Sequence, residues 1–234
     1  MTREPVDKTL KMYVGGSFIR SESGRTDPAE GRLRVNRASR KDLRSAVEIA
    51  GKAQPGWAKA TAYLRGQILY RIAEMLEGRR DAIANSIGEA GQDEVSASVD
   101  LLVSCAGWSD KHSQILGTAN QVAGPYHNFT VSEPVGIVGM IAPDQPSLLG
   151  LVALIAPAIL AGNTVIALAS RTKPQPSAEL GEVLATSDVP AGVVNILTGE
   201  LDELAPYFAS HREIAGLIAA GVGSDALHQR VGFR

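Results

Sequence analysis

The chain has 234 residues, a length that fits one domain or two small ones. Hydrophobic residues make up 44% and charged residues 21% of it, as in water-soluble globular proteins. Its 23 basic and 25 acidic residues give a formal net charge of −2, which favours neither nucleic acid nor an anionic membrane as a partner. A single cysteine, a charged first segment without the apolar core of a signal peptide, and no apolar run long enough to span a bilayer indicate a cytoplasmic protein.

The first half of the chain is predicted to be mostly helical. Apolar residues recur at helical spacing, and Ser39 with Asp42 forms a capping box that should start a helix. The expected elements, in chain order, are a strand pair over 11–19 around two glycines, a helix from 39 to about 51, a helix over 62–77 and a helix over 94–116.

The second half alternates short β-branched runs with helical segments. A β-hairpin is expected over 118–134, where polar and apolar residues alternate between turn residues. Strands are then expected over 135–141, 163–169, 191–199 and 214–220, with helices over 147–162, 176–186 and 202–210 and a last helix from Asp225. A serial β-α pattern predicts an α/β fold with a Rossmann-like parallel sheet and flanking helices.

Three blocks of this half, "EPVGIVGMIAP", "APAILAGNTVIAL" and "DVPAGVVNILTG", resemble in order and spacing the NAD-binding half of the aldehyde dehydrogenase superfamily. The segments "PDQPSLL" and "TSDVPAGVVNILTG" are more narrowly similar to the non-catalytic C-terminal domain of two-domain family-16 members. The resemblance implies a helical part of the NAD-binding domain over 1–117, an oligomerisation hairpin over 118–134 and Rossmann-like units over 135–234. The catalytic domain of the family, with its nucleophilic cysteine and general-base glutamate, is expected to be absent.

No catalytic residue is therefore predicted. Cys105 lies inside a helical run and is expected to be a packed thiol. In the loop "IAPDQP", Asp144 stands where the family has a tryptophan, and Gln145 stands where the family has the asparagine that stabilises the oxyanion. Gln145 shifts that amide donor by about one bond length, and Asp144 would oppose a developing negative charge.

A cofactor site is predicted in altered form. The family's lysine and glutamate for the ribose hydroxyls are replaced by Leu168, which cannot donate a hydrogen bond, and Arg171, which cannot accept one. Ser170 and Lys173 lie nearby and could substitute in part. The cofactor-binding residues proposed on this basis are Ile141, Ala142, Pro143, Gln145, Ser170, Lys173 and Gly221. We expect NAD to bind weakly or not at all, and the four scattered histidines predict no metal site.

Three functions remain open from the sequence. The first is a non-catalytic module that binds a second copy of itself, or a catalytic aldehyde dehydrogenase, through residues 118–134. The second is a fragment of an NAD(P)-dependent aldehyde dehydrogenase, an oxidoreductase acting on aldehydes. The third is a nucleotide-binding module without catalysis.

Overall fold

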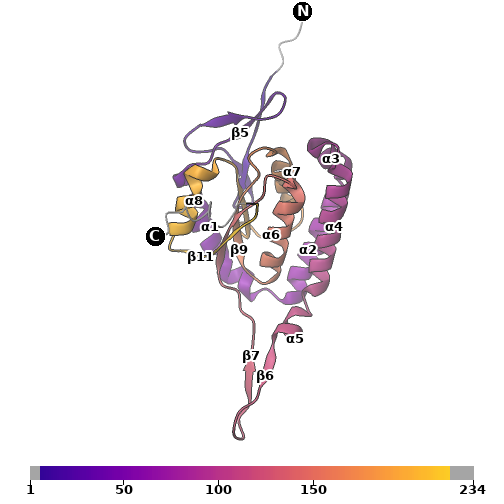
Figure 1. The fold of residues 1–234 in the computed structure, drawn as a ribbon, viewed down its shortest axis with the longest axis vertical. Helices are drawn as coiled ribbons and strands as arrows, with labels where there is room; N and C mark the ends of the chain where they lie inside the picture. The colour runs from indigo at the N-terminus through magenta and orange to yellow at the C-terminus, as the bar shows by residue number, and fades with distance from the viewer. Residues whose placement is uncertain (1–5, 222–234) are drawn as a thin grey trace, which may run out of the picture.

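A computed structural model gives the structure of residues 6–221, and its centre is a six-stranded sheet with the strand order β11-β8-β9-β10-β2-β3 (Figure 1). Four strands are parallel, namely β8 (Ile137–Ile141), β9 (Thr164–Leu168), β10 (Val194–Leu197) and β11 (Ile214–Ala219). Two short strands, β2 (Met12–Val14) and β3 (Ser17–Ile19), extend this sheet in antiparallel pairing. Every residue of β8, β9 and β10 is buried, as expected for parallel strands covered on both faces. The predicted Rossmann-like sheet is confirmed.

Helices cover both faces of this sheet in layers (Figure 1). One face carries α1 (Arg40–Lys59) and α8 (Leu201–Ser210), and the other carries α6 (Ser147–Leu160) and α7 (Gln175–Ala185). Outside α6 and α7 lie α2 (Ala62–Glu77), α3 (Arg80–Ile87) and α4 (Gly91–Trp108). Alternate residues of β9 belong to two separate apolar cores: Val165 and Ala167 to one, Ile166 and Leu168 to the other. Within residues 6–221, no helix is both long enough and apolar enough to cross a membrane.

Helix α6 is capped at both ends by charged side chains from neighbouring helices. At its N-terminus, Glu94 Oε1 accepts hydrogen bonds from the N–H groups of Leu148 at 2.6 Å and Leu149 at 3.0 Å. At its C-terminus, Arg65 Nε donates to the carbonyl of Leu160 at 2.7 Å. A carboxylate at the positive N-terminal end and a guanidinium at the negative C-terminal end both interact favourably with the helix dipole. Side chains of α4 and α2 thus complete the backbone hydrogen bonding of the central helix.

Two predicted helices have different limits in the structure. Helix α1 continues beyond Gly51 to Lys59 because Trp57, in its last turn, is buried and donates Nε1–H to the carbonyl of Ile159 at 2.9 Å. That packing outweighs the loss of one backbone hydrogen bond at Pro55. The helix expected over 94–116 is broken: α4 ends at Trp108, and a short helix, α5 (His112–Leu116), follows. The helix expected from Asp225 lies outside the described residues.

A small second sheet near the N-terminus was not predicted. Its strands are β1 (Lys8–Leu10), β4 (Thr26–Pro28) and β5 (Leu33–Asn36), in the order β1-β5-β4. The buried Asn36 of β5 donates its amide N–H to the carbonyl of Leu10 in β1 at 2.7 Å, and its amide oxygen accepts from the N–H of Ser21, in the segment after β3, at 3.1 Å. These strands are too short and too polar for a clear two-residue repeat.

The predicted β-hairpin is confirmed and projects from the body of the molecule (Figure 1). Its strands, β6 (Thr118–Asn120) and β7 (Asn128–Thr130), pair antiparallel, with Ala119 opposite Phe129. All six strand residues are exposed. The hairpin therefore has no apolar core within the described part of the chain, and its role in oligomerisation stays a prediction.

Candidate functional site

The main candidate site is a crevice at the carboxyl ends of the parallel strands. The chain runs from β8 to β9 and β10 on one side, whereas β11 pairs on the opposite side of β8. The strand order therefore reverses next to β8, and α/β sheets bind ligands at such switch points. The cavity here has a volume of about 440 Å³. It is lined by Ile141, Ala142, Pro143, Asp144, Leu168, Ala169, Arg171, Gly199, Glu200, Leu201, Asp202, Ala220 and Gly221.

Pro143 shapes one wall of this crevice by packing between two glycines. Gly221 has φ +73, and a Cβ there would approach Pro143 Cβ to 3.0 Å. A Cβ on Gly150, in the first turns of α6, would overlap the Pro143 ring. The end of β11 and the start of α6 can thus approach the loop after β8 only because both positions lack a side chain.

Asp144 joins the loop after β8 to the loop after β9. Its Oδ1 accepts hydrogen bonds from the N–H groups of Arg171 at 2.9 Å and Thr172 at 3.2 Å, and from the Ser170 hydroxyl at 3.2 Å. The Ser170 hydroxyl also lies 3.0 Å from the carbonyl oxygen of Asp144. The carboxylate is thus bound to three donors of the neighbouring loop. The sequence shows an acid beside a turn at this position. It does not show that the acid binds Arg171, 27 residues further along the chain.

Arg171 and Glu200 form an ion pair at the crevice. Arg171 Nε donates to Glu200 Oε1 at 2.6 Å, and this hydrogen bond raises the pKa of the Arg171 guanidinium. Both residues also line a second cavity of about 540 Å³ on the side of β4. Leu168 also lines the crevice, but it is 2% exposed because its side chain belongs to the apolar core. The crevice offers backbone groups, one guanidinium and carboxylates to a ligand.

The structure brings together four of the seven residues proposed for cofactor binding. Ile141, Ala142, Pro143 and Gly221 line the crevice. Gln145 is exposed and does not line it, within the described part of the chain. Ser170 is buried, and its hydroxyl is engaged by Asp144. Lys173 donates its ammonium group to the carbonyl of Ile87 at 2.6 Å, at the end of α3, so its charge is directed away from the crevice.

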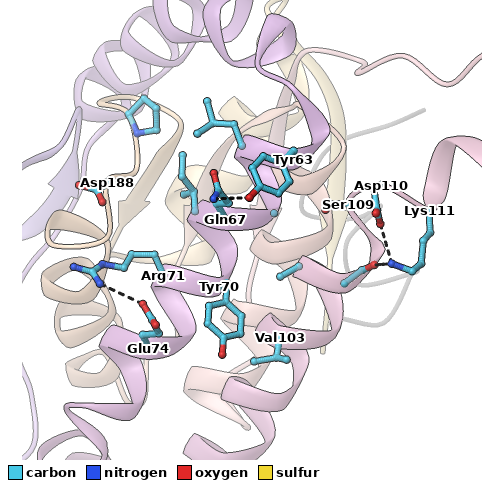
Figure 2. A pocket seen from close by; sticks show the side chains of 16 residues that line it. Tyr63, Gln67, Tyr70, Arg71, Glu74, Val103, Ser109, Asp110, Lys111 and Asp188 are labelled. Carbon is cyan, nitrogen blue, oxygen red and sulfur yellow. Dashed lines mark hydrogen bonds and ion pairs between the residues drawn. The ribbon is translucent and has the colours of Figure 1, made fainter.

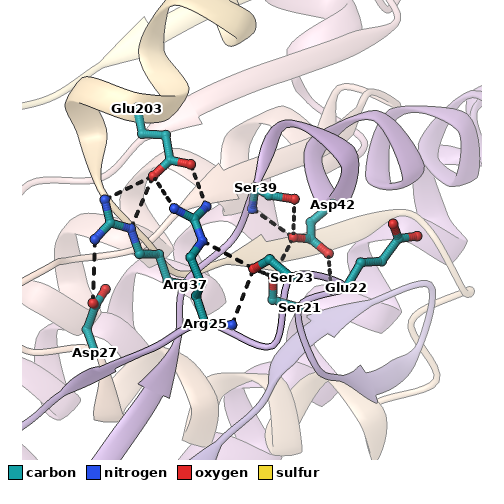
Figure 3. Close-up of polar contacts among 9 residues, drawn as sticks. All are labelled: Ser21, Glu22, Ser23, Arg25, Asp27, Arg37, Ser39, Asp42 and Glu203. Atoms are coloured by element: carbon teal, nitrogen blue, oxygen red, sulfur yellow. Dashed lines mark hydrogen bonds and ion pairs between the residues drawn. The ribbon is translucent and has the colours of Figure 1, made fainter.

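Arginines beside the N-terminal strands β4 and β5 bind the start of α8 (Figure 3). Glu203, in the first turn of α8, accepts hydrogen bonds from Arg25 and from Arg37, with Arg37 Nη2 at 3.0 Å from Glu203 Oε2. The hydrogen bond from Arg25 lowers the pKa of the Glu203 carboxyl. Asp27 lies 3.7 Å from the other side of the Arg37 guanidinium. These contacts hold the β10–α8 loop, which carries Glu200.

Cys105 is on α4 and is 9% exposed, away from the crevice lining. Burial raises the pKa of its thiol, which opposes the thiolate form that a nucleophile needs. The prediction of a packed helix thiol is confirmed. Among residues 6–221, no three His, Cys, Asp or Glu side chains gather where they could hold a metal ion.

A larger groove of about 930 Å³ lies on the outer helical layer (Figure 2), and none of its lining residues lines the crevice. Exposed Tyr63, Leu64 and Tyr70 of α2 face Val103 of α4 across it. Four of its charged groups are paired, since Arg71 binds Glu74 at 3.2 Å and Lys111 binds Asp110 at 2.8 Å, and the exposed Asp188 also lines it. The walls of the groove are mainly apolar.

Comparisons with known proteins agree with this geometry. The aldehyde dehydrogenase family model matches residues 20–232. The chain is 30% identical over 231 residues to 2-hydroxymuconic semialdehyde dehydrogenase of Pseudomonas sp. (strain CF600), covering 92% of this chain and 48% of that protein. It is 30% identical over 222 residues to the cytosolic aldehyde dehydrogenase 1 of Elephantulus edwardii, covering 87% and 44%.

A solved structure shows the same fold. An aldehyde dehydrogenase from Bacillus cereus, determined as an NAD+ complex, superimposes with a TM-score of 0.89 at 24% identity, covering 96% of this chain and 49% of that one. The chain thus spans about half the length of the relatives it matches. With a family match over residues 20–232, this chain belongs to the aldehyde dehydrogenase family.

Proposed function

We propose that this chain is the dinucleotide-binding half of an NAD- or NADP-dependent aldehyde dehydrogenase, an oxidoreductase acting on aldehydes. The observation that supports the proposal is the crevice at the switch point of the parallel sheet, the place where such sheets bind dinucleotides. The nucleophile must then come from a catalytic half, in the same polypeptide or in a partner chain, because the described part of this chain offers only the buried Cys105.

We further propose that the crevice binds the cofactor weakly. A ligand can reach backbone groups in the crevice, because Ala142 and Gly221 line it and Gly221 has no side chain to block them. At the two positions where the family resemblance implies the ribose contacts stand Leu168, which is buried and has no donor, and Arg171, which has no acceptor. Two missing charge-assisted hydrogen bonds, each worth roughly 1.5–3 kcal/mol, lower the affinity by about two to four decades.

The test is calorimetric titration of the 234-residue chain with NAD at up to about 10 mM. We expect a dissociation constant in the millimolar range, because the backbone contacts remain while the ribose contacts are lost. A micromolar constant would contradict the weak-binding proposal. No heat at all, with a folded protein, would contradict dinucleotide binding by the isolated chain.

A second candidate, a partner-binding module without catalysis, is favoured by the hairpin over 118–134. Tyr126, Phe129 and Val131 are 76%, 60% and 61% exposed. Isolated hairpins are marginal in water, and exposed apolar side chains on one promote sheet extension or packing across an interface. We propose that this hairpin binds a second copy of the chain or a catalytic aldehyde dehydrogenase.

An activity assay bears on both candidates. We expect the chain alone to form no NADH with a panel of aldehydes, because Cys105 is buried in α4. Turnover that Cys105→Ala abolishes would show that this thiol is the nucleophile after all. Turnover that appears only after a catalytic relative is added, beyond what the relative gives alone, would support the partner-binding candidate.

A further inference from the structure

The groove between α2 and α4 is a surface that the proposed dinucleotide function does not use. Tyr63 and Tyr70 stand about two turns apart on α2, both are exposed, and the exposed Val103 of α4 lies across from them (Figure 2). Exposed apolar patches on a water-soluble protein mark interaction surfaces. We propose that this groove receives the tip of the hairpin over 118–134 of a second copy of the chain, with Tyr126 as the anchor. The inference rests on the partner-binding candidate and deepens it.

The α4 side of the groove has unfilled space. Where α2 and α4 are in close contact, an added Cβ on Gly66 would come within 2.9 Å of Ser109 Cβ. At the exposed Gly107, by contrast, an added Cβ would meet no atom within 4 Å. The groove is therefore closed at Gly66 and open at Gly107, which leaves room for an aromatic ring of a partner, the side-chain type that most often anchors an interface.

The hairpin suits this groove in its chemistry. Residues 113–132 contain no Asp, Glu, Lys or Arg, and four charged groups of the groove are bound to one another in pairs. A neutral segment therefore docks without leaving an ion buried and unpaired. Asp188, the fifth charged residue of the lining, lies on the side of α2 away from Val103 and is exposed (Figure 2). Tyr126 is also exposed, and its ring is apolar while its hydroxyl can stay in water.

The position of the groove beside the root of the hairpin makes the contact reciprocal. Asp110 and Lys111 line the groove, and only α5 separates them from β6. The segment from Thr118 to Tyr126 spans roughly 25 Å when extended, and it leads away from the groove of its own chain (Figure 1). When two copies place their hairpins side by side and antiparallel, the tip of each reaches the root of the other. One two-fold axis then forms both contacts, as in most homodimers.

The first test fills the groove. Sedimentation velocity over about 1–100 µM gives the dimer dissociation constant, which Gly107→Leu and Tyr126→Ala should each raise about tenfold or more. The leucine occupies the open space, and the alanine removes the anchor. Gly56→Leu is the matched control, because Gly56 is also an exposed helical glycine where an added Cβ meets no atom within 4 Å, but it lies on α1, outside the groove.

The second test joins the two surfaces covalently. All chains carry Cys105→Ala, which removes the single cysteine of the sequence. Mixing Gly107→Cys chains with Tyr126→Cys chains under mild oxidation should give a disulfide-linked dimer, because the two positions are in contact across the two-fold axis. Neither variant should link to itself, since each tip meets the groove and not the other tip. Gly56→Cys chains mixed with Tyr126→Cys chains should stay unlinked.

The outcomes separate this inference from the functions proposed above. A wild type that stays monomeric at about 100 µM, or a hairpin that binds only a catalytic relative, overturns it and leaves the crevice proposal unchanged. A dimer that folded Gly107→Leu does not weaken, or mixed chains that do not link, overturns the groove assignment while the hairpin remains an interaction element. Equal weakening by Gly56→Leu shows a general effect and also overturns the assignment. If Gly107→Leu does not fold, the cross-linking result decides.

Discussion

The sheet around β8–β10 and the hairpin over 118–134 are both built from short strands, yet they obtain their stability differently. All residues of β8, β9 and β10 are buried, whereas all six residues of β6 and β7 are exposed. The sheet buries its side chains against helices of its own chain, and the hairpin has only its own ladder. The side chains of the first region are therefore stabilised by packing within the described residues, while those of the second need another surface to contribute to stability.

The largest effect on the free energy of unfolding is expected when side chains are truncated, and it should differ between the two regions. Leu151 of α6 is completely buried, and Leu151→Ala should reduce the free energy of unfolding by about 3 kcal/mol through lost burial and a residual cavity. Val131→Ala, at a position 61% exposed, should change it by less than about 0.5 kcal/mol. Urea unfolding of both variants measures this. Equal costs would mean that the hairpin is packed in solution.

A smaller loss of unfolding free energy is expected when the cation at the C-terminal end of α6 is removed. Arg65 is 8% exposed and donates to the carbonyls of Leu160 and Ala60. Arg65→Met should cost about 2 kcal/mol in unfolding free energy, because buried carbonyls lose their donor. The matched control is Arg44→Met, whose exposed pair with Glu48 should contribute under about 0.5 kcal/mol. A neutral Arg65→Met would show that the methionine packs as well as the capped charge.

The pH dependence of the core should change with Asp42. Burial tends to raise the pKa of this carboxyl, but hydrogen bonds from Ser39, Glu22 and Ser21 outweigh it and lower the pKa below its usual value (Figure 3). A lowered folded-state pKa stabilises the protein at pH above the unfolded value, about 3.9, and this stabilisation is lost as pH falls through the folded value.

Asp42→Asn should therefore cost about 1 kcal/mol at neutral pH and flatten the decline in stability below about pH 4. Thermal unfolding of wild type and variant between neutral and acidic pH gives both quantities. Parallel pH profiles would assign the acid sensitivity to other carboxyls.

The smallest effect on the core, and the sharpest on the hairpin, is expected from Thr130→Pro. Proline disfavours the β7 ladder opposite Thr118, so the oligomer mass should fall while the unfolding free energy of the core stays nearly unchanged. Thr130→Val, which keeps a β-branched residue, is the control. Light scattering decides: a wild type that is monomeric at tens of micromolar, with no larger species after a catalytic relative is added, would remove the partner-binding proposal.

The parallel strands could be predicted because each is a short run of β-branched and apolar residues between helical segments, a pattern that can be recognised without knowing any contact. The extent of α1 could not, since Gly51 and Pro55 indicate a helix end and only the burial of Trp57 overrides them. Of the proposed cofactor-binding residues, Pro143 and Gly221 lie at strand ends and line the crevice; their role in binding stays a prediction.

The side-chain contacts of the site could not be predicted, for a physical reason. Asp144 binds the 170–172 loop rather than pointing freely into the crevice, and Lys173 binds the end of α3. Both contacts join segments whose proximity exists only after the sheet has formed. Glu94, which caps α6 from α4 more than fifty residues away, was missed in the same way.

The capping of α6 from two other helices has a consequence for how the protein assembles. Until α4 and α2 dock, Glu94 and Arg65 are hydrated and the ends of α6 are exposed to water. After docking in a shifted register, Glu94 would lose its partners on α6, and Arg65 would keep only the carbonyl of Ala60 in its own segment. Misdocked intermediates are therefore selectively penalised, and the three helices should open and close as one cooperative unit. In hydrogen exchange, the amides of Leu148 and Leu149 should then exchange with the same opening free energy as the middle of α2 and α4, although helix ends usually fray first.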